Sequence, residues 1–258
     1  MVFLRGAICK YSALGNDFLI CERRRLPTAE RVKKECENGG VDGFIVVKNP
    51  GTTPEMVIFN ADGSRAETCG NGLRCVAAFC HEKGVNKHKF TIKTDAGEKL
   101  AEILNGRPFV CRVELGEAVF SDGKGIREEG LDPVEIEIDG RRVRLFVVDT
   151  GVPHAVIFGG DGLYRLAEQI SKHESFERGT NVDFADTENG KIRIKTFERG
   201  VGWTKACGTG GGAVFAVCRR LGLVGDKSTV FFDGGRLTVE TEENKIFITG
   251  EVKKEWEK

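Results

Sequence analysis

Short hydrophobic runs of the kind that form β-strands recur along most of the chain, separated by polar and glycine-containing segments. The turn residues Asp139-Gly140 and Asp233-Gly234-Gly235 each predict a tight hairpin between two neighbouring runs. The expected strands are residues 18–21, 44–47, 56–59, 90–94, 110–115, 134–138, 143–148, 155–158, 192–197, 230–232, 237–240 and 246–249.

Segments whose apolar residues repeat with helical spacing are fewer. They are residues 28–37, 73–83, 163–173 and 212–221. Many strands with a few helices placed between them predict an α+β protein.

An internal repeat is the most informative feature of the organisation. Phe59 precedes Cys69 by the same interval that separates Phe197 from Cys207, and each cysteine opens a Cys-Gly-X-Gly loop. Each loop follows a strand-like run and leads into a helix rich in small apolar residues. The chain therefore predicts two similar domains, 1–117 and 118–258. We place their boundary near the glycine-rich stretch 116–130, with the last strand as a candidate to pack back on the first domain.

Composition excludes several classes of function. Of the 258 residues, 40% are hydrophobic and 30% charged, as in an ordinary soluble protein. Lys plus Arg and Asp plus Glu number 39 each, and this balance argues against a nucleic-acid or anionic-membrane partner. The nearest approach to a basic run is Arg23 to Arg25, which is interpreted as a solvated face. No apolar run is long enough to span a membrane.

The nine cysteines lack the density of a disulfide scaffold, and the opening Met-Val-Phe-Leu-Arg lacks the apolar core of a signal peptide. Free thiols in a cytoplasmic protein are therefore expected. The chain contains no Cys-X-X-Cys, and Cys69, Cys75, Cys80 and His81 lack the spacing of a zinc module, so no metal is expected.

The two glycine-flanked cysteine loops carry the candidate chemistry. A lone cysteine near a helix start is usually a small buried hydrophobe, and we interpret Cys75, Cys80 and Cys218 in that way. Duplication of the whole context makes this interpretation poor for Cys69 and Cys207. Glycines leave backbone N–H groups accessible, and the first N–H groups of a helix bind carboxylates. The same field lowers the pKa of a thiol.

Two such loops acting on one amino acid would place a sulfur on either face of its α-carbon. One thiolate can then remove the α-proton while the opposite thiol delivers another, and the developing charge is stabilised at the carboxylate. This chemistry needs no cofactor, so neither a lysine motif for pyridoxal phosphate nor a metal cluster is required.

At these residues the sequence resembles the diaminopimelate epimerase family of cofactor-independent racemases. The resemblance lies in KYSALGNDFLI, FNADGSRAETCGNGLRC, DTGVPHAVIF, GTNVDF and FERGVGWTKACGTG, which follow the family's order. It implies two pseudo-symmetric domains, each a mainly antiparallel barrel-like sheet around a central helix, with the active site in the cleft between them. It also implies conversion of LL-diaminopimelate to the meso form in lysine and peptidoglycan-precursor synthesis. The resemblance further implies that the protein is a homodimer.

The resemblance assigns the site residue by residue. Cys69 and Cys207 match the catalytic thiols, and His154 has a supporting role. The family residues that hold the substrate's α-carboxylate match Gly70, Asn71, Gly208 and Thr209. Those that hold its distal amino and carboxylate groups match Asn16, Asn60, Asn181, Glu198 and Arg199.

Two departures from the family pattern concern substrate contact. Val152 stands where many relatives have asparagine, and Gly43 stands where some have glutamine. A racemase of lysine or another amino acid is therefore the first alternative, although lysine would leave the guanidinium of Arg199 without a partner. An isomerase without the thiol pair is disfavoured because both cysteines are present. A non-catalytic or thiol-redox protein on the same fold is the alternative from a different class.

Overall fold

The computed structural model describes residues 7–85, 87–121, 132–160 and 162–257. Most of the stretch expected to hold the domain boundary lies outside the described residues, as do the first six positions, on which the argument against a signal peptide depends. The chain divides into two compact units. The first runs to Glu114 and takes in the chain again from Thr249, and the second runs from Leu115 to Ile248.

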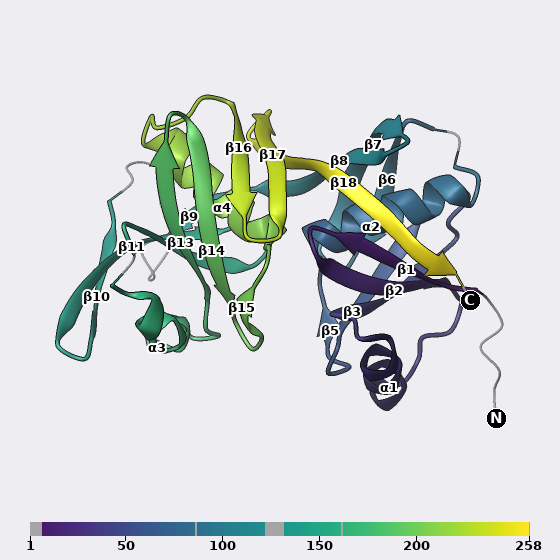
Figure 1. The fold of residues 1–258 in the computed structure, drawn as a ribbon, viewed down its shortest axis with the longest axis horizontal. Helices are drawn as coiled ribbons and strands as arrows, with labels where there is room; N and C mark the ends of the chain where they lie inside the picture. The colour runs from purple at the N-terminus through teal and green to yellow at the C-terminus, as the bar shows by residue number, and fades with distance from the viewer. Residues whose placement is uncertain (1–6, 86, 122–131, 161, 258) are drawn as a thin grey trace. The chain divides into compact units, whose positions relative to one another are not determined.

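The chain up to Glu117 forms eight strands and two helices (Figure 1). The strands are β1 (Ile8–Ala13), β2 (Asn16–Glu22), β3 (Gly43–Lys48), β4 (Glu55–Asn60), β5 (Arg65–Ala66), β6 (Lys89–Thr94), β7 (Gly97–Gly106) and β8 (Phe109–Glu117). The helices are α1 (Ala29–Gly39) and α2 (Gly70–Glu82).

The remaining strands are β9 (Val119–Ser121), β10 (Val134–Ile138), β11 (Arg141–Asp149), β12 (Pro153–Phe158), β13 (Asn181–Glu188), β14 (Lys191–Glu198), β15 (Gly202–Thr204), β16 (Lys227–Phe232), β17 (Gly235–Glu242) and β18 (Lys245–Glu257). The helical segments here are the short η1 (Tyr164–Leu166), α3 (Ala167–Ser171) and α4 (Gly208–Arg220). The final part of β18 belongs to the first unit, where it pairs with β1.

Strand pairing repeats between the units. In the first, β2 runs parallel to β3, β3 antiparallel to β4, β4 antiparallel to β5 and parallel to β6, and β6 antiparallel to β7. In the second, β12, β13, β14, β15, β16 and β17 pair in the same senses and order. The expectation of two pseudo-symmetric α+β domains is confirmed.

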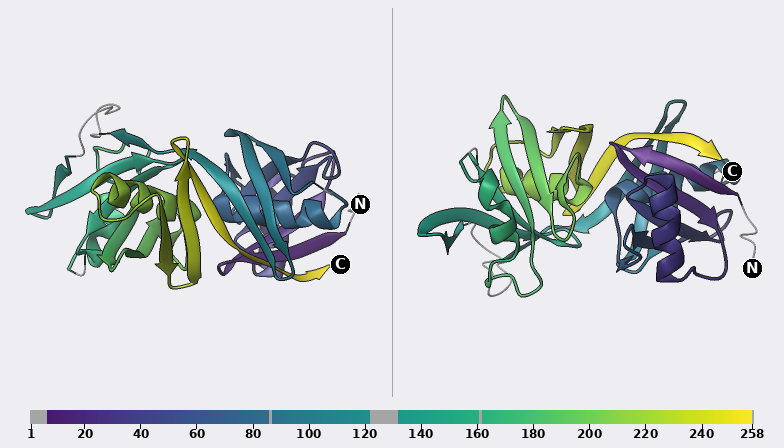
Figure 2. Two further views of the ribbon diagram at one scale, coloured as in Figure 1. Left: turned by 90° about the horizontal axis from the view of Figure 1, so that it is seen from above. Right: turned by 60° about the horizontal axis from the view of Figure 1, so that its bottom comes forward.

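Each unit is built around one helix of the repeat. α2 packs against β1, β2, β4 and β7, and α4 packs against β11, β12, β13, β14, β16 and β17 of its own unit. Both helices are buried along nearly their whole length, which explains their small and apolar residues. Figure 2 shows each as a rod enclosed by the strands of its own unit, whereas α1 lies outside the first sheet. In the described part of the chain, no helix has the length and apolar character needed to cross a membrane.

All twelve expected strands and both hairpin turns are confirmed. The turn at Asp139-Gly140 uses left-handed backbone at both residues, as a tight hairpin requires. The sequence analysis missed β1, β5, β7, β9, β13 and β15. In β7 and β13 charged residues interrupt the hydrophobic run.

Three of the four expected helices form, and α2 and α4 begin earlier than predicted, at the glycines of the loops. The prediction of one helix over 163–173 is wrong, because the segment splits into η1 and α3. The carbonyl of Ser171 accepts from the N–H of Thr180 at 3.0 Å, and the N–H of Ser175 donates to Nδ1 of His173 at 3.2 Å. These bonds replace the next helical hydrogen bond, so the helix ends at Ser171.

Candidate active site

The first cysteine loop caps the central helix of its unit. Cys69 is the N-cap residue of α2, with extended backbone, and its Sγ accepts from the N–H of Gly72 at 3.5 Å. Its side chain is partly exposed. Gly70 and Asn71 form the first turn of the helix, where backbone N–H groups have no partner within the helix. The loop therefore combines a thiol with N–H donors suited to a carboxylate.

The side chain of Asn71 is buried and held by an arginine one turn along the helix. Nη2 of Arg74 donates to Oδ1 of Asn71, and Nη1 donates to the carbonyl of Glu251 at 3.3 Å. Arg74 is completely buried, and no hydrogen-bond partner of its Nε is found among the described residues. The sequence analysis missed Arg74, although a single charge inside a buried helix could have identified it.

The other predicted residues of the first unit lie at strand ends. Asn16 begins β2, and its Oδ1 is buried without a hydrogen-bond partner in the described structure. Asn60 ends β4, donates to Oγ of Ser64 at 2.9 Å, and stands opposite Gly43 in the register. A Cβ on Gly43 would lie 2.8 Å from the carbonyl oxygen of Phe59, so a glutamine there would require the backbone to shift.

The second loop repeats the first with a more enclosed thiol. Cys207 is the N-cap of α4, and its Sγ accepts from the N–H of Gly210 at 3.4 Å. The hydroxyl of Thr209 lies 3.3 Å from the same sulfur. The Thr209 carbonyl accepts from Oγ1 of Thr150 at 3.0 Å, which fixes the loop to the end of β11. Gly208 and Thr209 thus correspond to Gly70 and Asn71.

Burial raises the pKa of the Cys207 thiol well above its usual range, and the nearby carboxylates of Glu198 and Asp183 raise it further. Hydrogen bonds from Thr209 and Gly210 act in the lowering direction. The expectation of a net lowered thiol pKa is therefore wrong at this cysteine, because desolvation disfavours the thiolate more strongly than the donors at the helix N-terminus favour it.

A buried polar network lies beside the second loop. Oδ2 of Asp183 is 2.6 Å from Nδ1 of His154, and Oδ1 accepts from the hydroxyl of Thr196 at 2.7 Å. The other ring nitrogen of His154 lies 3.5 Å from Nδ2 of Asn181. A Cβ on Gly210 would lie 2.4 Å from Oδ1 of Asp183, so the network reaches the loop itself. Sequence reasoning missed Asp183 and Thr196, although Asp183 belongs to the quoted motif GTNVDF.

Three predicted substrate contacts meet at the start of β13 and the end of β14. Oδ1 of Asn181 accepts from the backbone N–H of Arg199 at 2.9 Å. Nη1 of Arg199 donates to the carbonyls of Arg178 and Gly179. Oε1 of Glu198 accepts from the hydroxyl of Thr204 at 2.7 Å. Asn181 and Arg199 are thus held together, and the charge of Glu198 acts on Cys207.

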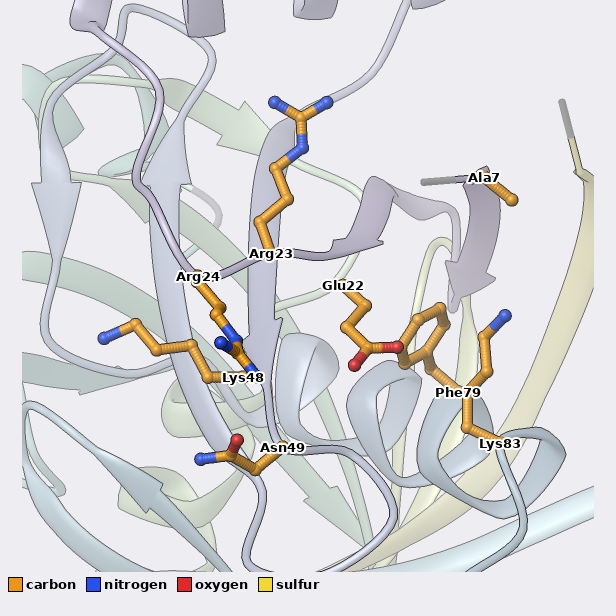
Figure 3. Close-up of a pocket in the computed structure, with 8 residues that line it drawn as sticks. All are labelled: Ala7, Glu22, Arg23, Arg24, Lys48, Asn49, Phe79 and Lys83. Carbon is orange, nitrogen blue, oxygen red and sulfur yellow. The ribbon is translucent and has the colours of Figure 1, made fainter. Parts of the chain in front are cut away.

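A pocket of about 360 Å³ opens elsewhere on the first unit (Figure 3). It is lined by Ala7, Glu22, Arg23, Arg24, Lys48, Asn49, Phe79 and Lys83. In the close-up the guanidinium of Arg23 points away from the amine of Lys48, so the cations do not converge. None of the lining residues belongs to the predicted site.

The fold of this chain is shared by solved structures of racemases and epimerases. A predicted epimerase from Pseudomonas aeruginosa superposes with a TM-score of 0.75, at 15% identity and over 98% of each chain. A hydroxyproline epimerase from Agrobacterium vitis gives a TM-score of 0.72 at 16% identity, over 100% of this chain and 93% of its own. The two units therefore have the fold of these two epimerases.

Sequence comparison narrows this class to one family. A family model described as diaminopimelate epimerase matches residues 8–121 and 146–255. The diaminopimelate epimerase of Caldanaerobacter subterraneus is 38% identical over 94% of this chain and 95% of its own. That of Archaeoglobus fulgidus is 35% identical over 96% and 93%. The chain belongs to the diaminopimelate epimerase family, as its motifs predicted.

Proposed function

We propose that this protein interconverts the LL and meso forms of 2,6-diaminopimelate by moving a proton at one α-carbon without a cofactor. The proposal is supported by the chain's curated relatives, which are named diaminopimelate epimerases. The observation that carries the proposal is the pair of helices capped by Cys69 and Cys207. A two-base inversion requires one proton carrier for each face of the carbon.

The substrate's α-carboxylate is assigned to the N–H groups that follow each cysteine. Gly70 and Asn71 supply them in the first loop, and Gly208 and Thr209 in the second. These donors sit at the positive ends of two thirteen-residue helices. They stabilise the negative charge that reaches the carboxylate oxygens when the α-proton leaves.

Each sulfur carries out one of the two proton transfers at the α-carbon. One thiolate takes the α-hydrogen as a proton, so that an S–H bond forms and the C–H electron pair delocalises into the carboxylate. The opposite thiol then gives its proton to the other face of the carbon, which restores the C–H bond with inverted configuration and leaves that sulfur as the thiolate. The two cysteines have exchanged roles, and the reverse reaction restores them.

The distal end of the substrate carries a second ammonium and carboxylate. The buried Oδ1 of Asn16 is an acceptor without a partner among the described residues, as expected of a group that awaits an ammonium. Glu198 offers a carboxylate for the same purpose, and Arg199 offers a planar cation for the carboxylate. Asn60 and Asn181 complete this set, and His154 supports Asn181. Lysine would leave Arg199 without its carboxylate.

The test is an assay of the purified protein in deuterium oxide, with LL-diaminopimelate and L-lysine as separate substrates. Chiral chromatography and mass spectrometry follow inversion and incorporation of deuterium at the α-carbon. The variants Cys69→Ala and Cys207→Ala are compared with Cys80→Ala and Cys218→Ala, which remove buried thiols from the interiors of the same two helices.

We expect deuterium in the inverted diaminopimelate, loss of inversion in both loop variants, and retained inversion in both control variants. Inversion without deuterium would contradict the proton-transfer mechanism. Faster turnover of lysine would contradict the substrate assignment. Inversion that survives either loop substitution would contradict the two-base pair.

A further inference from the structure

The buried polar network of the second unit is one continuous set of hydrogen bonds. The hydroxyl of Thr196 donates to Oδ1 of Asp183 at 2.7 Å, and Oδ2 of Asp183 lies 2.6 Å from Nδ1 of His154. Nε2 of the same ring lies 3.5 Å from Nδ2 of Asn181, whose Oδ1 accepts from the backbone N–H of Arg199 at 2.9 Å. The network crosses the neighbouring strands β12, β13 and β14 and ends at a residue assigned to the substrate.

The repeat shows that the fold itself does not require this network. In the first unit Ile45 stands opposite Ile58, as Asp183 stands opposite Thr196 in the second. Ile58 and Thr196 each directly precede the phenylalanine that repeats at the same interval before a loop cysteine. The two pairs therefore occupy equivalent places, and the pair in the first unit is apolar and buried.

The glycine three residues after each loop cysteine supports the same equivalence. The nearest atoms to a Cβ added on Gly72 belong to the isoleucine pair, at 3.2 Å from each side chain. For Gly210 they include Oδ1 of Asp183 at 2.4 Å and Oγ1 of Thr196 at 3.2 Å. The helix start of each unit thus packs on the same two positions, which are apolar in one unit and polar in the other.

His154 has an apolar counterpart as well. It stands opposite Asn181 in the parallel pairing of β12 with β13, and the buried Phe18 stands opposite Gly43 in the equivalent pairing of β2 with β3. Apolar side chains in place of a complete buried polar set cost little stability. A carboxylate enclosed at this place therefore serves something other than the fold.

The network has a single direction of hydrogen bonding. A carboxylate provides only acceptors, so Nδ1 of His154 carries the proton that faces Asp183. At the other end the backbone N–H of Arg199 can only donate, so the Asn181 amide turns its oxygen toward this N–H and its nitrogen toward the ring. Nε2 must then be bare, because an amide nitrogen provides only donors. Both ends require the same neutral tautomer of the ring.

We propose that Asp183 is a positioning residue, which fixes the tautomer of His154 and, through that ring, the orientation of the Asn181 amide. The amide in turn holds the backbone of Arg199. The inference rests on the proposed function in that Asn181 and Arg199 bind the distal end of the substrate. Asp183 is completely buried, so it acts through these residues and keeps the distal site assembled before the substrate arrives.

The first experiment determines the tautomer in the intact protein and needs no turnover. The protein is labelled with ¹⁵N-histidine, and long-range ¹H–¹⁵N correlation spectra distinguish the two neutral tautomers from each other and from the doubly protonated ring. Of the four histidines, His154 is identified by the signals that disappear in His154→Gln. We expect a neutral ring protonated at Nδ1. A proton on Nε2, alone or together with one on Nδ1, would overturn the proposal.

The second experiment replaces the carboxylate by an amide, which provides a donor as well as acceptors. In Asp183→Asn we expect a population of His154 with the proton on Nε2. We also expect KM for diaminopimelate to rise by about tenfold with kcat within about threefold of wild type, because binding at the distal end is lost equally before and during the reaction. Asp186→Asn, at an exposed position of β13, is the matched control and should change neither.

The change of tautomer and the rise in KM must occur together in Asp183→Asn. Either one without the other, the absence of both, or a fall in kcat alone would overturn the proposal. A double-mutant cycle then tests the route of the effect. Once Asn181→Ala has raised KM, adding Asp183→Asn should raise it by less than about twofold more, because the group that Asp183 positions is gone. Additive effects on KM would overturn the proposal.

Circular dichroism identifies a variant that fails to fold. If Asp183→Asn does so, the triple variant His154→Phe, Asp183→Ile and Thr196→Ile takes its place, because it copies the apolar residues of the first unit. A folded triple variant with the KM of wild type would overturn the proposal, and if neither variant folds the wild-type tautomer decides alone. The spectra give a result even if the protein fails to epimerise diaminopimelate, so failure of the proposed function and failure of this inference are distinguishable.

Discussion

Asp183 and His154 form a completely buried pair in the second unit, with Oδ2 of the carboxylate 2.6 Å from Nδ1 of the ring. Asp183 also accepts from Thr196, and the ring in turn contacts Asn181. A carboxylate in a dry interior is tolerated when such partners satisfy it. The pair therefore links the strand core of the unit to a residue assigned to the substrate.

Asp183→Ala should lower the free energy of unfolding by about 3 kcal/mol, because it leaves buried hydrogen-bonding groups on His154 and Thr196 without their acceptor. Urea denaturation followed by circular dichroism measures the change. Asp186→Ala, at an exposed position of the same strand, is the control and should stay within about 0.5 kcal/mol of wild type. Equal effects in the two variants would show that the buried network contributes nothing.

Gly210 is required in the second loop because a neighbouring side chain approaches its backbone closely, and not because the backbone turns there. A Cβ on Gly210 would stand 2.4 Å from Oδ1 of Asp183, whereas one on Gly72 would first meet the methyl ends of Ile45 and Ile58 at 3.2 Å and then Cβ of Cys69 at 3.4 Å. Gly210→Ala should therefore cost about 1–3 kcal/mol and disturb the Cys207 loop.

Gly72→Ala should cost less than Gly210→Ala, and Gly225→Ala, where a Cβ meets open space, should cost least. Thermal and urea unfolding of the three variants give the ranking. A Gly210→Ala protein as stable as Gly225→Ala would contradict the close approach of Asp183 to the loop.

Charge and hydrogen bonding should move the titration of Cys207 in opposite directions. Glu198→Gln removes a neighbouring anion and should lower the Cys207 pKa, whereas Thr209→Val removes a hydroxyl that favours the thiolate and should raise it. The pH dependence of Cys207 alkylation measures both. Thr209→Ser keeps the hydroxyl and should behave like wild type. Shifts of the same sign in Glu198→Gln and Thr209→Val would refute this account.

Buried thiols should make the protein less stable at alkaline pH. Burial raises the pKa of Cys80, Cys111 and Cys218 to about 12, from an ordinary value of 9.0. Below about pH 9 both the folded and the unfolded chain keep these protons, so the thiols do not lower the free energy of unfolding. Between about pH 9 and 12 the unfolded chain alone releases them, and each thiol then costs about 1.4 kcal/mol per pH unit.

Urea unfolding at about pH 8 and about pH 10 measures this loss. The double variant Cys80→Ala and Cys218→Ala has a lower baseline, but its further loss between the two pH values should be smaller than that of wild type by about 3 kcal/mol. An identical loss in both proteins would exclude these thiols as its cause.

Sequence patterns predicted the strands with continuous hydrophobic runs, because such runs form the core whatever surrounds them. They missed β13, since Asp183 interrupts its apolar run and becomes acceptable only when His154 and Thr196 arrive from other strands. They also extended a helix past Ser171, whose carbonyl is taken by Thr180. Contacts between distant segments decided both outcomes, and no local pattern contains them.

The sequence by itself determined the family, the duplicated cysteine loops and the α+β class, because these depend on residue order and on hydrophobic runs. Only the tertiary structure decided how unlike the two loops are. Cys207 is buried near two carboxylates, whereas the loop of Cys69 is partly exposed and its Asn71 accepts from the cation of Arg74. The physical reason is that the charge state of a thiol depends on desolvation and on neighbouring charges, which the fold brings together from separate strands.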